Sequence, residues 1–253
     1  WRCAASCAPI ILTKSSHDLD IIHWLLGQTA VSVASYGNLG YFRRENAPPE
    51  AADRCVDCPL QETCLYSATR FYRHSKEGWP FEVIAPPPDT LADRVRAIEE
   101  GPYGRCVWRN DNDVCDNQTV ILEFESGIHA TFGLQGLTAD NTRKITILFD
   151  KGELTGDLHQ SRITISHFTG EKDHLEIEEV PLPDTGDSHG GGDLHLLYAL
   201  HSYLTRGEHS EVVTSLRSSI PSHVLAFLAE DSRTKDNVKL PVPDVLLPSA
   251  VAG

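Results

Sequence analysis

The sequence predicts an α+β fold: a broad, mostly antiparallel, open-faced β-sheet with helices on one face. Apolar residues alternate with polar ones through residues 118–180, which is the pattern of half-buried strands. Two stretches with helical spacing follow, at residues 196–204 and 219–233. Because strands and helices do not alternate along the chain, a parallel sheet with crossover helices is not expected.

A helix and a strand are the first elements expected along the chain. After His17, apolar residues recur with helical spacing as far as Gly27, a residue type that commonly ends helices. The β-branched residues Val31 and Val33 then stand at alternate positions. Residues 30–36 are therefore predicted to form a strand.

The composition changes over residues 41–88, where proline, cysteine and charged residues replace the apolar pattern. We expect an insertion beside the main core, with one short helix at residues 65–73. Three prolines at 86–88 close this segment, and Asp89 or Thr90 can cap a helix that runs to about Glu100.

The sheet is expected to be a meander of about five to seven strands with short connections. The turns fall at Ser126–Gly127, Lys151–Gly152, Gln160–Ser161 and Thr169–Gly170. After the glycines at 190–192 come the two predicted helices, and the tail beyond Lys239 is expected to be extended.

Charge and composition exclude several classes of partner. Acidic residues outnumber basic ones by 36 to 22, and the formal charge of −14 repels nucleic acid and anionic membranes. No apolar stretch approaches the roughly 20 residues of a membrane-spanning helix, and we recognise no signal peptide. The seven cysteines are an odd and sparse set, which favours a reducing, cytoplasmic location. Because the chain begins at Trp1 and contains no methionine, we expect it to be a fragment.

Three cysteines have the spacing of metal ligands. Cys55 and Cys58 form a CxxC pair, and Cys64 follows at a distance that could supply a third thiolate to a structural zinc ion. His74 or a more distant group would be the fourth ligand. The alternative is a set of reduced cysteines packed as small apolar residues.

Several stretches, in one order, resemble a subgroup of the Gfo/Idh/MocA (glucose-fructose oxidoreductase/inositol dehydrogenase) family. They are TKSSHDLDIIHWLLG at 13–27, RCVDCPLQETCLYSA at 54–68, GPYGRCVWRNDNDVCDNQ at 101–118, SHGGGD at 188–193 and SHVLAFLAEDSR at 222–233. The resemblance implies that residues 1–253 are a C-terminal substrate-binding and oligomerisation domain whose Rossmann domain precedes Trp1. It also implies an NAD(P)-dependent oxidoreductase for a sugar, cyclitol or related polyol, and a homo-oligomer formed through the sheet face.

The same resemblance makes His17 the catalytic histidine. An imidazole can accept and return a proton near neutral pH, which suits removal of a hydroxyl proton. Without the resemblance, a histidine before an apolar helix would be interpreted as a cap or as a partner of a core carbonyl. The family pattern often has an aspartate four residues earlier, where this chain has Thr13. Lys14 could contact the substrate oxygen or a dinucleotide phosphate, or be a solvated surface lysine.

Asp18 and Asp20 are expected in the first turn of the helix, where carboxylates favour the positive end of the helix dipole. Asp18 is a candidate for substrate binding, but capping is the simpler role for it. Asp20 matches the aspartate of the family's HxxD pattern and could orient His17 or bind a sugar hydroxyl. His23 is expected to be a core or interface residue.

Two polar segments are further candidates for substrate binding. The first could bind polyol hydroxyls but is better explained by turns that satisfy their own backbone; its residues are Arg105, Arg109, Asp111, Asn112, Asp113 and Asp116. In the second, His189 and Asp193 flank three glycines before a helix, where a ligand could bind or Asp193 could serve as N-cap. This GGGD run does not match GxGxxG, so NAD or NADP would be bound mainly by the missing domain.

Two other functions stay open beside a simple dehydrogenase. Some relatives use transient NAD reduction to cleave glycosides. A catalytically silent binding or assembly module is also consistent with the change at Thr13.

Overall fold

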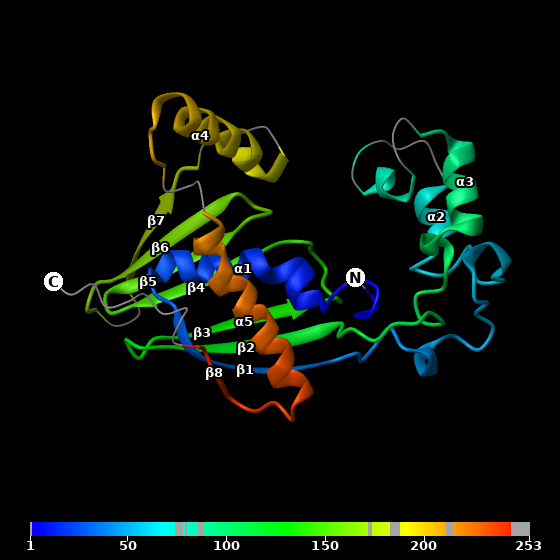
Figure 1. Ribbon diagram of the computed structural model, residues 1–253, viewed down its shortest axis with the longest axis horizontal. Helices are drawn as coiled ribbons and strands as arrows, with labels where there is room; N and C mark the ends of the chain where they lie inside the picture. The colour runs from blue at the N-terminus through cyan, green and yellow to red at the C-terminus, as the bar shows by residue number, and fades with distance from the viewer. Residues whose placement is uncertain are drawn as a thin grey trace. The chain divides into compact units, whose positions relative to one another are not determined.

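The computed structural model describes residues 2–73, 78, 80–85, 89–171, 174–182, 188–210 and 215–243. The chain divides into two units, the first formed by Trp1–Gly136 with Ser219–Gly253 and the second by Leu137–Ser218 (Figure 1). Each unit is described by itself. Among the described residues, no helix combines the length and the apolar character needed to cross a membrane.

The first unit is built on an antiparallel sheet with the strand order β3-β2-β1-β8. The strands are β1 (Ala30–Asn38), β2 (Asn117–Phe124), β3 (His129–Gln135) and β8 (Leu240–Pro241). Along β2, buried residues alternate with more exposed ones, so one face of the sheet is covered and the other is open. The predicted alternation of residues is confirmed for this strand.

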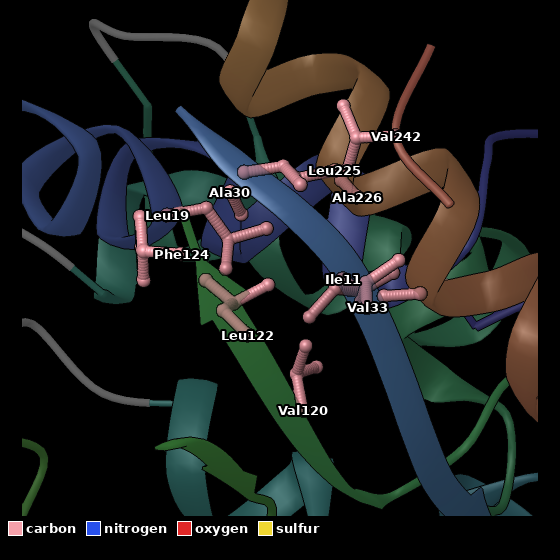
Figure 2. Close-up of a cluster of buried hydrophobic side chains, with 11 residues drawn as sticks. Ile11, Leu19, Ala30, Val33, Val120, Leu122, Phe124, Leu225, Ala226 and Val242 are labelled. Carbon is pink, nitrogen blue, oxygen red and sulfur yellow. The ribbon is translucent and has the colours of Figure 1, made fainter. Parts of the chain in front are cut away.

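Helices α1 (Ile10–Leu26) and α5 (Leu216–Thr234) cover the apolar face of this sheet. Figure 2 shows how their side chains meet those of β1 and β2. Val33 lies opposite Leu122 in the register, which places both in the same layer. The core consists of Ile11, Leu19, Ala30, Val33, Val120, Leu122, Phe124, Leu225, Ala226, Ala229 and Val242.

Helix α1 begins well before the position expected from the sequence. It starts at Ile10 after Pro9 and ends at Gly27, whose φ of 61° allows its N–H to bond the carbonyls of His23 and Trp24. His17 therefore lies in the middle of the helix and not at its entrance. The prediction that Asp18 and Asp20 occupy the first turn is wrong, and no acidic residue stands there.

Between β1 and β2 the chain forms a lobe, residues 41–116, with short helices and small apolar clusters. Its helices are η1 (Arg44–Asn46), η2 (Cys55–Asp57), α2 (Ala68–Tyr72), η3 (Phe81–Ile84), α3 (Leu91–Glu100) and η4 (Pro102–Gly104). Thr90, one of the two residues expected as the cap, caps α3 in a reciprocal capping box with Asp93. A Cβ atom on Gly104 would lie 1.6 Å from the carbonyl oxygen of Ile98, so only glycine fits there.

The second unit contains a meander of four antiparallel strands in the order β4-β5-β6-β7. These are β4 (Lys144–Phe149), β5 (Gly152–Asp157), β6 (Arg162–Phe168) and β7 (Leu175–Val180). A short 3-10 helix, η5 (Ser188–Gly191), leads into helix α4 (Gly192–Arg206). The predicted α+β class with open antiparallel sheets is confirmed, and the described strands form two sheets of four, one in each unit.

Candidate functional site

The candidate site lies on the side of α1 that faces away from the core. Ile11, Ser15 and Leu19 recur every four residues, and all three are buried. Lys14 and His17 are exposed and stand three residues apart, which places them on the same side of the helix. One face of α1 is thus fixed by packing, while the other presents an ammonium group and an imidazole.

His17 is paired with the carboxylate of its neighbour Asp18. The distance from His17 Nδ1 to Asp18 Oδ2 is 2.9 Å, and the two side chains are 56% and 15% exposed. Thr13, which replaces the aspartate of the family pattern, turns its hydroxyl to the helix backbone, 3.4 Å from the carbonyl of Pro9. Asp18 therefore supplies the imidazole with a carboxylate that Thr13 does not.

The two other polar residues singled out on α1 have different surroundings. Asp20 is half-buried, and its carboxylate makes no hydrogen bond with any side chain or backbone group that the structure describes. His23 donates from Nδ1 to the carbonyl of Gln28 over 2.7 Å. This bond supports the prediction that His23 is a satisfied structural residue.

The polar segment before β2 mainly holds its own part of the fold together. The carboxylate of Asp116 accepts the backbone N–H groups of Gly40, Tyr41 and Phe42 at 2.9, 2.6 and 3.0 Å. Burial opposes ionisation of Asp116, but these N–H groups outweigh it and lower the pKa of the carboxyl group. Asn112 donates to the carbonyls of Phe42 and Val107, both at 2.6 Å. The interpretation as turns is supported for these two residues.

The aspartates at 111 and 113 tie the N-terminal segment to the same part of the lobe. Asp111 accepts from Arg2 Nε at 3.1 Å, and Asp113 accepts the backbone N–H of Ala4 at 2.7 Å. The pKa of Asp111 is lowered, first by its own backbone N–H and then by Arg2 and Arg105. These contacts also serve the structure of the lobe.

The prediction of zinc at Cys55, Cys58 and Cys64 is not supported. Within the described ranges, no group of three or more His, Cys, Asp or Glu side chains is arranged to hold a metal ion, and His74 lies outside those ranges. The three cysteines and Cys106 instead line a small, mainly apolar cavity. Burial raises the pKa of the Cys55 thiol, which favours the protonated and apolar form. Residue spacing alone did not determine how the sulfur atoms are arranged.

His189 and Asp193 form a second histidine–carboxylate pair, which belongs to the second unit. His189 Nδ1 lies 2.8 Å from Asp193 Oδ2, and the side chains are 79% and 60% exposed. The N-cap of α4 is Gly191, so the alternative in which Asp193 caps the helix is wrong. Asp193 stands in the first helical turn, where its charge favours the helix dipole.

Comparison with known proteins gives a match over most of the chain. Residues 5–240 match the model of the Gfo/Idh/MocA oxidoreductase family's C-terminal alpha/beta domain. The YteT protein of Bacillus subtilis (strain 168), classed by name as an oxidoreductase, is 25% identical over 194 residues, which is 73% of this chain and 44% of YteT.

Solved structures with the same fold include two proteins of different kinds. Levoglucosan dehydrogenase in complex with NADH and levoglucosan superposes with a TM-score of 0.56 at 11% identity, over 91% of this chain and 49% of that one. A super-repressor mutant of Gal80p from Saccharomyces cerevisiae gives a TM-score of 0.58 at 12% identity, over 96% of this chain and 52% of that one. The chain thus spans about half the length of the proteins it matches.

Proposed function

The chain belongs to the Gfo/Idh/MocA oxidoreductase family, and we propose that it is the substrate-side part of an NAD(P)-dependent oxidoreductase. The proposed reaction is oxidation or reduction at a hydroxyl-bearing carbon of a sugar, cyclitol or related polyol. The observation that carries this proposal is the His17–Asp18 pair on the exposed side of α1, within the stretch that resembles the family's catalytic segment.

In this proposal His17 accepts the hydroxyl proton while hydride leaves the same carbon for the nicotinamide. Asp18 is a positioning residue: its carboxylate accepts from Nδ1, so Nε2 is the nitrogen that would exchange the proton. Lys14, on the same side of α1, would place its ammonium near the substrate oxygen as negative charge develops there. Asp20 is proposed to contact a substrate hydroxyl. The pair His189–Asp193 is proposed, by itself, as a substrate-binding pair of the second unit.

The dinucleotide would be held mainly by the rest of the protein. In the described part of the chain, the strands pair antiparallel, and the glycine run that precedes α4 does not have the GxGxxG pattern of a pyrophosphate site. We therefore assign this chain the proton transfer and substrate contacts, with Lys14 the one candidate for a dinucleotide phosphate. The residues that would select NAD or NADP are proposed to lie outside this chain.

The second unit is proposed to form the contact between subunits. Leu148 and Ile177 lie in one row across the four strands. Leu148 is opposite Glu153, Glu153 is opposite Ser166, and Ser166 is opposite Ile177. Phe168 and Leu175 are paired two positions further along and share that face. These four side chains are between 50% and 73% exposed, which supports burial against a second copy of the sheet.

Replacing His17 tests the proposed chemistry. In the intact protein, His17→Ala should lower turnover by roughly 100-fold to 10,000-fold, the usual contribution of a general acid–base group, with little change in cofactor affinity. Lys14→Ala should also lower turnover if the ammonium stabilises the alkoxide, but should mainly raise the cofactor KM if it binds phosphate.

His23→Ala is the matched control on the same helix. It removes the bond to the Gln28 carbonyl and should lower thermal stability while leaving turnover nearly unchanged. Near wild-type turnover of His17→Ala between about pH 6 and pH 9 would overturn the catalytic assignment. It would favour the second candidate function, a silent binding module.

A further inference from the structure

A pocket in the first unit gathers arginines from three separated segments of the lobe. We name it the arginine pocket; its lining consists of Arg44, Asp53, Arg54, Arg105, Arg109, Asn110 and Asp111. Arg54 and Arg105 are brought together by an isolated antiparallel bridge between their backbones. The pocket is separate from the side of α1 that carries His17, and none of these residues belongs to the proposed proton transfer.

Two of the charged groups are already committed to the protein. Arg54 Nη2 donates to the carbonyls of Ile98 and Gly101 at 2.7 and 2.8 Å, where it closes the C-terminal end of α3. Asp111 is paired with Arg2 Nε at 3.1 Å. The charges left for a ligand are therefore the guanidinium groups of Arg44, Arg105 and Arg109 and the carboxylate of Asp53.

These three guanidinium groups use few of their donors. Arg44 Nη2 donates to the Arg109 carbonyl at 3.3 Å, and Arg105 Nη1 donates to Asn110 Oδ1 at 3.5 Å. Arg109 Nη1 is 4.0 Å from Asp53 Oδ1, and Asp53 is 75% exposed. Arg109 Nε is buried and has no hydrogen-bond partner among the residues that the structure describes. Since a guanidinium carries five N–H donors, most of these groups' capacity is unused.

The lining holds four guanidinium groups against two carboxylates, those of Asp53 and Asp111, so the pocket has a positive excess in a chain whose formal charge is −14. Like charges held at one pocket repel each other unless an anion lies between them. Planar guanidinium groups bind carboxylate and phosphate through paired hydrogen bonds. We propose that the arginine pocket binds the oxyanion of a small ligand, a carboxylate or a phosphate group. The proposal is independent of the reaction assigned to His17.

Binding can be measured on the intact protein without any catalytic assay. Inorganic phosphate and malonate are titrated separately, and the melting temperature is compared with that in sodium chloride at matched ionic strength. At least one of the two anions should raise the melting temperature saturably, because a ligand that binds only the folded state stabilises it. A saturable effect of malonate indicates a carboxylate ligand, and a saturable effect of phosphate indicates a phosphoryl ligand.

Substitutions of the lining residues test whether the anion binds in the arginine pocket. The double variant Arg105→Gln/Arg109→Gln should weaken binding by roughly 10-fold to 100-fold, the loss expected for hydrogen bonds to a charged group. Arg43→Gln is the matched control, because this neighbour of Arg44 does not line the pocket. Asp53→Asn should tighten binding, since it removes the competing carboxylate. If the double variant does not fold, Arg44→Gln alone serves, because that side chain is exposed on η1.

The proposal fails under any of three results. These are the absence of a saturable effect for both anions beyond that of chloride, unchanged affinity in the folded arginine variants, and weaker binding in Asp53→Asn.

Discussion

Replacing Asp116 with alanine tests whether the polar segment before β2 exists for the fold or for the substrate. In the structure, Oδ2 accepts the N–H groups of Tyr41 and Phe42, while Oδ1 accepts the N–H of Gly40 and the Nδ2 of Asn117. One carboxylate thereby fixes the first residues of the lobe to the start of β2. Asp116→Ala leaves three backbone donors without this acceptor.

The size of the loss follows from these bonds. A hydrogen bond to a charged group contributes about 1.5–3 kcal/mol, and an orphaned donor regains part of this where water can reach it. Since Asp116 is only partly buried, we expect Asp116→Ala to lower the free energy of unfolding by about 2–4 kcal/mol. Asp116→Asn keeps one acceptor oxygen and should cost about half as much.

The pH dependence gives a second measurement with a definite sign. Because the folded protein holds the pKa of Asp116 below its ordinary value, the stabilisation is complete above the ordinary pKa and is lost as pH falls through the folded one. Urea unfolding should show a constant gap between wild type and Asp116→Ala from about pH 7 to pH 5, narrowing below about pH 4.

Asp57→Ala is the control for this experiment, because the Asp57 side chain is exposed on η2 and has no hydrogen-bond partner in the described part of the chain. It should change the free energy of unfolding by less than about 0.5 kcal/mol. The reasoning would be refuted if Asp116→Ala kept wild-type stability and instead raised the substrate KM of the intact protein in the assay of the proposed reaction.

Two further predictions concern the cysteines and the subunit contact. Cys58→Ser and treatment with a chelator should each leave the melting temperature nearly unchanged, because the described geometry offers no metal site; one equivalent of bound zinc would contradict this. Leu148→Lys should reduce the oligomer mass measured by light scattering while the circular dichroism spectrum is retained, because this side chain is 73% exposed on the proposed contact face; an unchanged mass would count against that face.

The strands and α3 could be predicted because their signals are local. Val120, Leu122 and Phe124 alternate with more exposed residues, and the same three side chains are buried in the structure. Thr90 and Asp93 stand at the spacing of a capping box, which depends on one turn of helix alone. Signals of this kind need no knowledge of the rest of the chain.

The start of α1 could not be predicted because packing outweighs local preference there. Residues 13–16 contain a threonine and two serines, which favour caps and turns over helix interiors. Ser15 nevertheless lies on the buried face between Ile11 and Leu19, in register with the core. Burial of the apolar residues against the sheet decides the conformation of this segment.

The sequence indicated only parts of the arginine pocket and of the cysteine cavity, because both are assembled from segments that are far apart in the chain. Arg44, Arg105 and Arg109 come from two segments about 60 residues apart, and only the fold of the lobe brings them together. Cys106 joins Cys55, Cys58 and Cys64 across a similar separation. Spacing rules describe residues within one or two turns, so they could neither predict this pocket nor exclude zinc.

The sequence did not identify Asp18 as the residue paired with His17, because helical geometry favours contacts between residues three or four positions apart. Neighbouring residues on a helix project in different directions. A carboxylate that contacts His17 is therefore expected at position 13, where this chain has a threonine, or at position 20, where it has Asp20. In the structure the adjacent Asp18 makes the contact, with its carboxylate 2.9 Å from Nδ1 and largely shielded from solvent. A carboxylate that accepts from Nδ1 fixes the tautomer and orientation of the ring regardless of its place in the sequence. The threonine at position 13 therefore does not by itself argue against catalysis, and the choice between enzyme and silent module depends on the turnover of the His17 variant.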